Sequence, residues 1–149
     1  MSEIVEAITA EQIEQVRQLF RQYQAELPLP YRFELPALPG EYGPPHGTLL
    51  LATVSGQPVG CVGLRPFPLD ATCEMKRLYV RPIFRGGKLG KELVDRVLQH
   101  ARALGYQRIR LDTHPSTMQA AVKLYRRLGF QEVTATDPVE GLVYMELAL

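Results

Sequence analysis

Hydrophobic side chains recur along the chain with two different periods. In residues 10–25, 89–104 and 118–128 they return every three or four positions, which is the period of a helix with one buried face. Shorter apolar or alternating stretches between these segments indicate strands. The predicted strands cover residues 4–7, 48–54, 58–64, 72–80, 108–112, 131–133 and 142–147. This order, in which no repeat is detectable, predicts one mixed α/β domain over residues 1–149.

Local signals support the boundaries of these elements. Thr9, with Gln12 three positions later, is typical of a capping box at the start of a helix. Gly105 and Gly129 follow the last apolar positions of the other two predicted helices, where a C′ glycine is common. The turn residues 55–57 separate two strands and indicate a hairpin.

Residues 28–47 are rich in proline and also carry Tyr31, Phe33 and Tyr42. Proline removes amide donors and fixes the backbone, so we expect a stiff loop with one short helical turn. Two interpretations stay open for this segment: a loop that simply packs on the domain, or a flap over a substrate site.

Composition narrows the class of protein. The chain has 149 residues and a net charge of +1, so it has no overall field that would attract nucleic acid or an anionic membrane. No apolar run is long enough to span a bilayer and no signal-peptide pattern is present, which favours the cytoplasm. Cys61 and Cys73 lie in apolar strands and are expected to be free buried thiols. Three scattered histidines give no metal-ligand spacing, so no metal is expected.

A glycine-rich loop joins the strand that ends at Val80 to the next helix. Its residues are Arg85, Gly86, Gly87, Lys88, Leu89 and Gly90. The first amides of a helix have no intrahelical partner and lie at the positive end of the dipole, so they attract anions. A Walker A loop would need Ser or Thr after the lysine, and a dinucleotide fingerprint would need glycine in place of Arg85. The loop therefore predicts a phosphate site of another kind.

Two segments resemble motifs of the GNAT superfamily of N-acetyltransferases. Leu78-Tyr79-Val80-Arg81-Pro82, followed by the loop at 85–90, is similar to the family's strand pattern Leu-Tyr-Val-x-Pro and its pyrophosphate loop Gln/Arg-x-x-Gly-x-Gly/Ala. Further on, residues 124–130 are similar to the family's segment Leu-Tyr-x-x-x-Gly-Phe. The chain departs from the pattern at Lys88, where glycine is usual, and at Met118, where asparagine is common.

The resemblance implies a fold and a co-substrate. The expected fold is a mixed, mostly antiparallel sheet with a splayed central strand pair, flanked by about four helices. The expected co-substrate is acetyl-CoA. Residues 85–90 would bind its pyrophosphate, and the main-chain groups of Leu78 and Val80 would bond its pantetheine arm.

The resemblance also suggests two catalytic residues. Tyr125 would protonate the departing thiolate, because the family's tyrosine in this segment commonly does so; the alternative is a core aromatic residue. Glu74 would serve as the base, since some relatives carry a catalytic glutamate early on this strand. Simple alternation places Glu74 on the same face as Leu78 and Val80. A solvated glutamate paired with Lys76 or Arg77 is the alternative.

The base and the acceptor stay open at this stage. A water chain or His114, which follows the strand at 108–112, could replace Glu74. A small-molecule amine is the favoured acceptor, with a protein or peptide amine, or an acyl-CoA sensor without turnover, as alternatives. A homodimer through the terminal strands is also possible.

Overall fold

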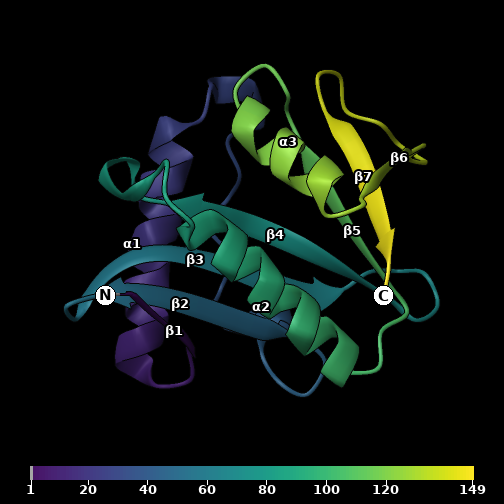
Figure 1. The fold of residues 1–149 in the computed structure, drawn as a ribbon. Coiled ribbons are helices and arrows are strands. Elements are labelled where there is room, and N and C mark those ends of the chain that lie inside the picture. Colours follow the sequence, from purple (N-terminus) through teal and green to yellow (C-terminus); the bar gives the residue numbers. More distant parts are fainter. Residues whose placement is uncertain (1) are drawn as a thin grey trace.

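The computed structural model describes residues 2–149, apart from the side chain of residue 30, and contains one seven-stranded sheet (Figure 1). The spatial order is β1-β2-β3-β4-β5-β7-β6. The strands are β1 (Ser2–Glu6), β2 (Thr48–Val54), β3 (Gln57–Pro66), β4 (Thr72–Val80), β5 (Arg108–Thr113), β6 (Gln131–Val133) and β7 (Val143–Ala148). Only β4 and β5 are parallel, so the expectation of a mixed, mostly antiparallel sheet is confirmed.

Three α-helices flank the sheet within the described residues, one fewer than the expected number of about four. They are α1 (Ala10–Glu26), α2 (Leu89–Ala103) and α3 (Gln119–Arg127). The capping box at Thr9 and Gln12 is present at the start of α1. The segment at 28–47 forms only two single turns, η1 (Leu29–Tyr31) and η2 (Gly40–Tyr42), because its prolines lack the amides that a longer helix needs. A third turn, η3 (Pro82–Phe84), follows β4.

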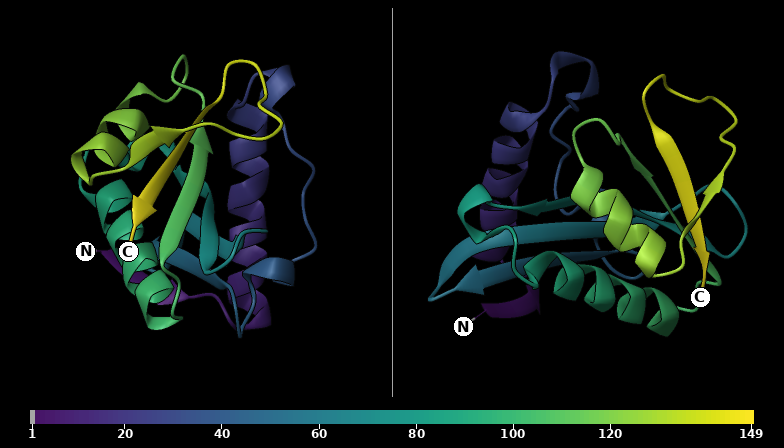
Figure 2. Two further views of the ribbon diagram at one scale, coloured as in Figure 1. Left: turned by 90° about the vertical axis from the view of Figure 1, so that its right-hand side faces the viewer. Right: turned by 45° about the horizontal axis from the view of Figure 1, so that its top comes forward.

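The two faces of the sheet are covered differently. Leu93 and Val97 of α2 pack with Val62 of β3 in one core, whereas Phe20 of α1 packs with Cys61 of β3 in the other. In Figure 2 (left) the strands lie between α1 on one side and α2 and α3 on the other. We call these the α1 face and the α2 face. Cys61 and Cys73 are free and buried, as expected. No described helix is long and apolar enough to cross a membrane.

β4 and β5 pair only at their beginnings, over Thr72–Glu74 and Arg108–Arg110, and then diverge. β4 continues along β3, while β5 continues along β7. The divergence, visible in Figure 1, is the splayed central pair that the sequence led us to expect. It leaves the later part of β4 without a strand partner on that side.

A β-bulge in β4 corrects one expectation. The register with β3 shifts between Cys61 and Gly63, and Arg77 has a φ of 60°. Because a bulge adds one residue to one strand, it reverses the alternation of side chains beyond it. Leu78 and Val80 pack against the core on the α2 face, whereas Glu74 pairs with a β3 arginine on the α1 face. Glu74 therefore does not share a face with Leu78 and Val80.

Candidate active site at the diverging strands

A cavity lies where β4 and β5 diverge, and we call it the central cavity. It is lined by residues of α1, β4, β5 and α3: Tyr23, Met75, Lys76, Arg77, Leu78, Leu111, Asp112, Thr113, Met118, Ala121 and Tyr125. Ligand sites in open α/β sheets commonly form where neighbouring strands separate in this way.

Two larger cavities share residues with the central cavity. The loop-side cavity, of about 340 Å³, extends past Val80 and Arg85 towards the glycine loop and shares Tyr23, Leu78 and Ala121. The flap-side cavity, of about 230 Å³, lies under residues 31–33 and shares Lys76, Arg77 and Asp112. The central cavity is thus the junction of a space beside the glycine loop and a space beside the proline-rich segment.

The backbone of β4 offers hydrogen-bonding groups to the gap. The amide of Arg81 donates to the carbonyl of Val59 on β3 at 2.9 Å, so in the alternating ladder the main-chain groups of Val80 and Leu78 point away from β3. The Val80 carbonyl accepts a hydrogen bond from Arg85 Nε at 2.7 Å. The amide of Val80 and the carbonyl of Leu78 therefore face the gap without a partner strand.

The glycine loop leads into a helix end that has no side-chain cap. The first intrahelical bond of α2 runs from the Glu92 amide to the Lys88 carbonyl, which leaves the amides of residues 89–91 without a helical acceptor. A Cβ atom on Gly86, Gly87 or Gly90 would meet nothing within 4 Å, so the space above the loop is open. Lys88 has a φ of −97°, which any L residue adopts, and therefore its replacement of the usual glycine does not strain the loop.

Arg85 is already paired. Its guanidinium lies 2.6 Å from Glu26 Oε1 at the end of α1, and it also stands over the ring of Tyr79. The Tyr79 hydroxyl donates a hydrogen bond to the same carboxylate. These contacts, together with the bond to Val80, hold the loop against α1 and β4, so part of the Arg85 charge is neutralised by Glu26.

Tyr125 lines the central cavity from α3. It is 5% exposed, its ring contacts Phe130, and its hydroxyl makes no hydrogen bond within residues 2–149. Burial, with smaller contributions from Tyr23 and Asp112, raises the pKa of this phenol above its ordinary value. The side chain is therefore protonated near neutral pH and can donate a proton to an anion formed beside it.

Comparison with known proteins decides the family. Residues 13–130 match the sequence profile described as "Acetyltransferase (GNAT) family". The chain belongs to the GNAT acetyltransferase family. The resemblance inferred from the two motifs and the expected enzyme class are thereby confirmed.

Named relatives support this assignment. The GNAT domain is 46% identical, over 112 residues, to an uncharacterised N-acetyltransferase of Schizosaccharomyces pombe, a match that covers 73% of this chain and 68% of the yeast protein. It is 36% identical to the IAA acetyltransferase of Azospirillum brasilense, covering 59% of this chain and 57% of that protein. It is 37% identical to mouse N-acetylaspartate synthetase, covering 63% of this chain and 31% of that protein.

Solved structures share the fold. A GNAT acetyltransferase of Staphylococcus aureus Mu50 superposes with a TM-score of 0.80 at 19% identity, covering 99% of both chains. A Salmonella typhimurium structure that holds acetyl-CoA superposes with a TM-score of 0.78 at 17% identity, covering 99% of this chain and 94% of that one.

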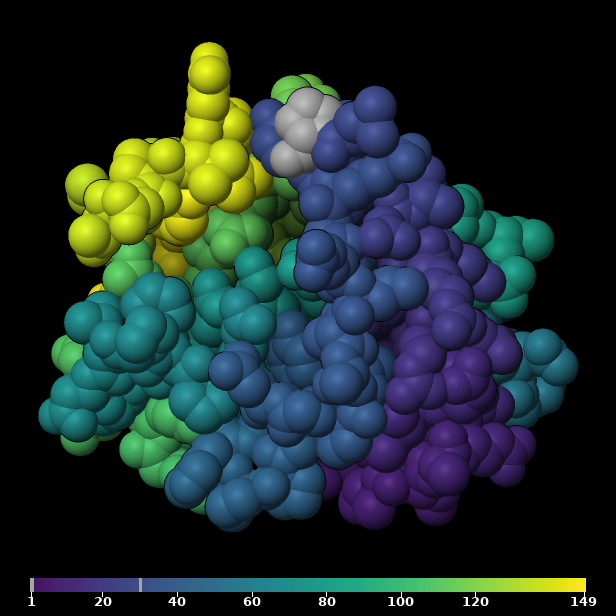
Figure 3. Space-filling model, turned by 180° about the vertical axis from the view of Figure 1, so that it is seen from behind, coloured from purple at the N-terminus to yellow at the C-terminus, as the bar shows by residue number. Residues whose placement is uncertain are grey.

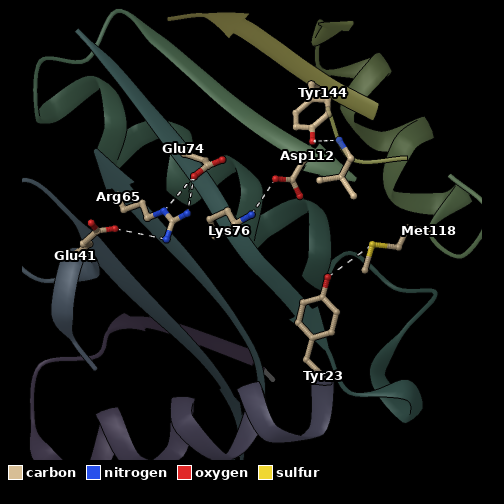
Figure 4. A network of polar contacts seen from close by, with 9 residues as sticks. Tyr23, Glu41, Arg65, Glu74, Lys76, Asp112, Met118 and Tyr144 are labelled. Atoms are coloured by element: carbon tan, nitrogen blue, oxygen red, sulfur yellow. Dashed lines mark hydrogen bonds and ion pairs between the residues drawn. The ribbon is translucent and has the colours of Figure 1, made fainter. Parts of the chain in front are cut away.

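Glu74 does not reach the central cavity of this GNAT domain. Its carboxylate pairs with Arg65 at 3.0 Å, and Arg65 also contacts Glu41 (Figure 4). Glu74 instead lines a neighbouring cavity of about 300 Å³ with Arg110 and Tyr144. The structure therefore does not bring Glu74 and Tyr125 together, although Glu74 faces the same side of the sheet as the flap-side cavity.

Polar residues that the sequence did not assign to the site also line the central cavity, among them Lys76, Asp112 and Tyr23. Lys76 and Asp112 form an ion pair of 2.9 Å across the diverging strands (Figure 4). Tyr23 stacks on Tyr79, its hydroxyl contacts Met118 Sδ at 3.8 Å, and burial raises its pKa to about 12. The position of Asp112 at the end of a strand could have signalled a site, whereas Tyr23 belongs to the apolar stripe of α1 and is indistinguishable from core by its spacing.

His114 lies between the two outer cavities rather than in the central one. Its ring stacks on Tyr31 with centroids 4.6 Å apart, and its Nδ1 contacts the hydroxyl of Thr117. Burial lowers its pKa, and Asp112 opposes this shift only partly. The imidazole is thus neutral near pH 7 and is held by neighbours from two segments.

The proline-rich segment both packs and lines a cavity. Phe33 and Tyr42 meet Phe20 of α1 edge to face, with centroids 6.2 and 6.3 Å apart. Tyr31, Arg32 and Phe33 also line the flap-side cavity. In Figure 3 the segment, in blue, lies beside α1, and the surface is hollowed between it and the yellow C-terminal segment. Packing on α1 gives this rim of the cavity a fixed position.

Proposed function

We propose that this GNAT domain transfers the acetyl group of acetyl-CoA to the amine of a small molecule. The observation that carries the proposal is the central cavity, which joins a space beside the uncapped start of α2 to a second space under residues 31–33. The loop-side cavity suits acetyl-CoA, which is a long phosphorylated thioester, and the flap-side cavity suits the amine that accepts the acetyl group.

The co-substrate fits the loop side. Its pyrophosphate would accept hydrogen bonds from the free amides at residues 89–91, where the helix dipole and Lys88 favour negative charge. Its pantetheine arm would run along β4 and bond the unpaired groups of Leu78 and Val80. This placement brings the thioester to the central cavity.

The chemistry follows from the groups at that cavity. The neutral amine attacks the thioester carbonyl, the tetrahedral intermediate collapses, the C–S bond breaks, and the thiolate takes a proton from Tyr125. The attacking nitrogen must also lose a proton. Glu74 would accept it through bridging water, because its carboxylate lies on the same face of the sheet as the flap-side cavity, although it lines a neighbouring cavity and pairs with Arg65.

Two observations favour a small acceptor. The flap-side cavity is bounded by a segment that packs firmly on α1, and its volume of about 230 Å³ suits a compact molecule rather than a protein surface. Two relatives are named for small molecules, an IAA acetyltransferase and N-acetylaspartate synthetase.

The test is an acetyl-transfer assay across a panel of small amines, with release of free thiol as the readout and acetyl-CoA affinity measured by calorimetry. Transfer to one or more small amines, together with binding, supports the proposal. Binding without transfer to small amines or peptides would indicate a sensor, and transfer to peptides alone would indicate a protein acetyltransferase; either result would overturn the proposal.

A further inference from the structure

Arg77 differs from the other arginines that face the α1 side of the sheet. Arg65 pairs with Glu74 and Glu41, and Arg110 with Glu146. Within residues 2–149 the guanidinium of Arg77 has no ion pair and no hydrogen bond, and its Nε is fully buried. It instead lies over the ring of Phe33, with Cζ 3.7 Å from the ring centroid. A cation–π contact compensates only part of the desolvation of a buried charge.

The position of Arg77 depends on the bulge in β4. Its φ of 60° is uncommon for a residue with a side chain, so the backbone is held there by its surroundings. The bulge turns Arg77 to the α1 face while Leu78 turns to the α2 face. As a result Arg77 lines both the central and the flap-side cavities but not the loop-side cavity. Its charge therefore faces the acceptor rather than the phosphates of the co-substrate.

The charges around the flap-side cavity leave an excess of cations. Its charged residues are Arg32, Lys76, Arg77 and Asp112. The single carboxylate, Asp112, already pairs with Lys76 at 2.9 Å. Burial keeps His114 neutral, and Glu74 does not line this cavity. Arg32 uses Nε to bond the Leu27 carbonyl, which leaves its remaining donors and all those of Arg77 without an anionic partner.

We propose that the acceptor is a small amine that also carries a carboxylate, as an amino acid does, and that Arg77 binds this carboxylate with Arg32 at the rim. This inference rests on the proposed acetyl transfer and specifies its substrate. A planar guanidinium accepts a carboxylate through two parallel hydrogen bonds, which fixes the orientation of a small molecule. Once the carboxylate is held there, the amine can point towards the thioester at the junction with the central cavity.

The experiment compares acceptors that differ in one group: amino acids, their carboxamides and the corresponding decarboxylated amines. The wild type should acetylate the acids with a kcat/KM at least about 10-fold above that for the amides. Arg77→Met keeps an apolar chain over Phe33 but removes the charge. It should lower kcat/KM for the acids by about 10- to 100-fold and leave that for the amides nearly unchanged.

Two further variants separate recognition from structure. Arg77→Lys restores the charge and should recover part of the preference for acids. Arg102→Met removes an exposed arginine from α2 on the other face and should change nothing. Arg32→Met should reduce the preference for acids to a smaller extent, and it provides an independent test if the substitution of Arg77 prevents folding.

The acceptor panel distinguishes failure of the carboxylate inference from failure of the proposed acetyl transfer. If the wild type releases thiol with amines but prefers amides or polyamines, acetyl transfer stands and the carboxylate inference is wrong. Equal losses on acids and amides in Arg77→Met would show that Arg77 only supports the structure. If no amine is acetylated, the proposed function fails, and this inference fails with it.

Discussion

Placing a carboxylate at Gly87 should abolish most of the affinity for acetyl-CoA without harming the fold. A Cβ at Gly87 meets nothing within 4 Å, and its φ is not in the left-handed region, so a side chain fits there without strain. Gly87 immediately precedes Lys88, the residue that stands before the first turn of α2 without a side-chain cap. A glutamate in this loop would therefore lie next to the bound pyrophosphate.

The magnitude follows from Coulomb's law. At a separation of about 5 Å, two unit charges of the same sign repel by about 0.8 kcal/mol in water and by about 3 kcal/mol at an effective dielectric constant near 20. With about two negative charges on the pyrophosphate, Gly87→Glu should weaken binding by about 2 to 6 kcal/mol, or about 20-fold or more in Kd.

The assay is isothermal titration with acetyl-CoA, and the matched control is Gly87→Gln. The amide has nearly the size of the carboxylate but no charge, so Gly87→Gln should lose far less affinity. Because salt of about 1 M screens charges beyond about 3 Å, raising the salt should narrow the gap between the two variants. Equal losses in both variants would mean that bulk, not charge, matters. Unchanged binding in both would remove the loop from the site.

Three other predictions follow from named contacts. Tyr125→Phe should lower kcat about 100-fold or more in the thiol-release assay while leaving acetyl-CoA affinity and stability nearly unchanged, because its hydroxyl makes no hydrogen bond within residues 2–149. Gly63→Ala should destabilise the fold by about 1 to 3 kcal/mol in urea unfolding, since a Cβ there lies 2.5 Å from the ring of Tyr42; an unchanged midpoint would contradict the packing. Burial lowers the pKa of His114, so the unfolded chain binds more protons, and stability should fall as pH drops through the unfolded value of about 6.5. His114→Gln should flatten that slope between about pH 7.5 and pH 5.5, and an unaltered slope would assign it to other groups.

The sequence predicted those features that depend on interactions between residues close together in the chain. Helices and strands follow from hydrophobic period, and the start of α1 follows from the reciprocal bonds of Thr9 and Gln12. The strand, glycine loop and helix start at residues 80–90 were also predictable, and the helix that follows the loop has no side-chain cap. Binding of an anion at this loop stays a prediction. These features need no knowledge of distant partners.

Features that depend on how strands pair could not be predicted, because the sequence of one strand does not show its register with the next. Whether β4 contains a bulge is decided by its register with β3, and a single extra residue at Arg77 reverses every face assignment beyond it. Strict alternation places Glu74 and Leu78 on the same face, whereas the bulge between them puts the two side chains on opposite faces. Tyr23 was missed for a related reason, since a helical stripe has the same spacing whether it packs against core or borders a cavity.

The bulge also allows one strand to present different groups to two cavities. Without it, consecutive side chains of β4 would alternate strictly, and its unpaired backbone would present a uniform edge to the gap. With it, Leu78 turns to the α2 face and Arg77 turns to the α1 face at the point where β5 departs. The main-chain groups of Leu78 and Val80 then line the side leading to the glycine loop, while the guanidinium lines the side beneath residues 31–33. The left-handed backbone at Arg77 therefore separates the main-chain groups beside the loop-side cavity from the guanidinium beside the flap-side cavity. Under the proposed function, these two sides are the thioester path and the acceptor path.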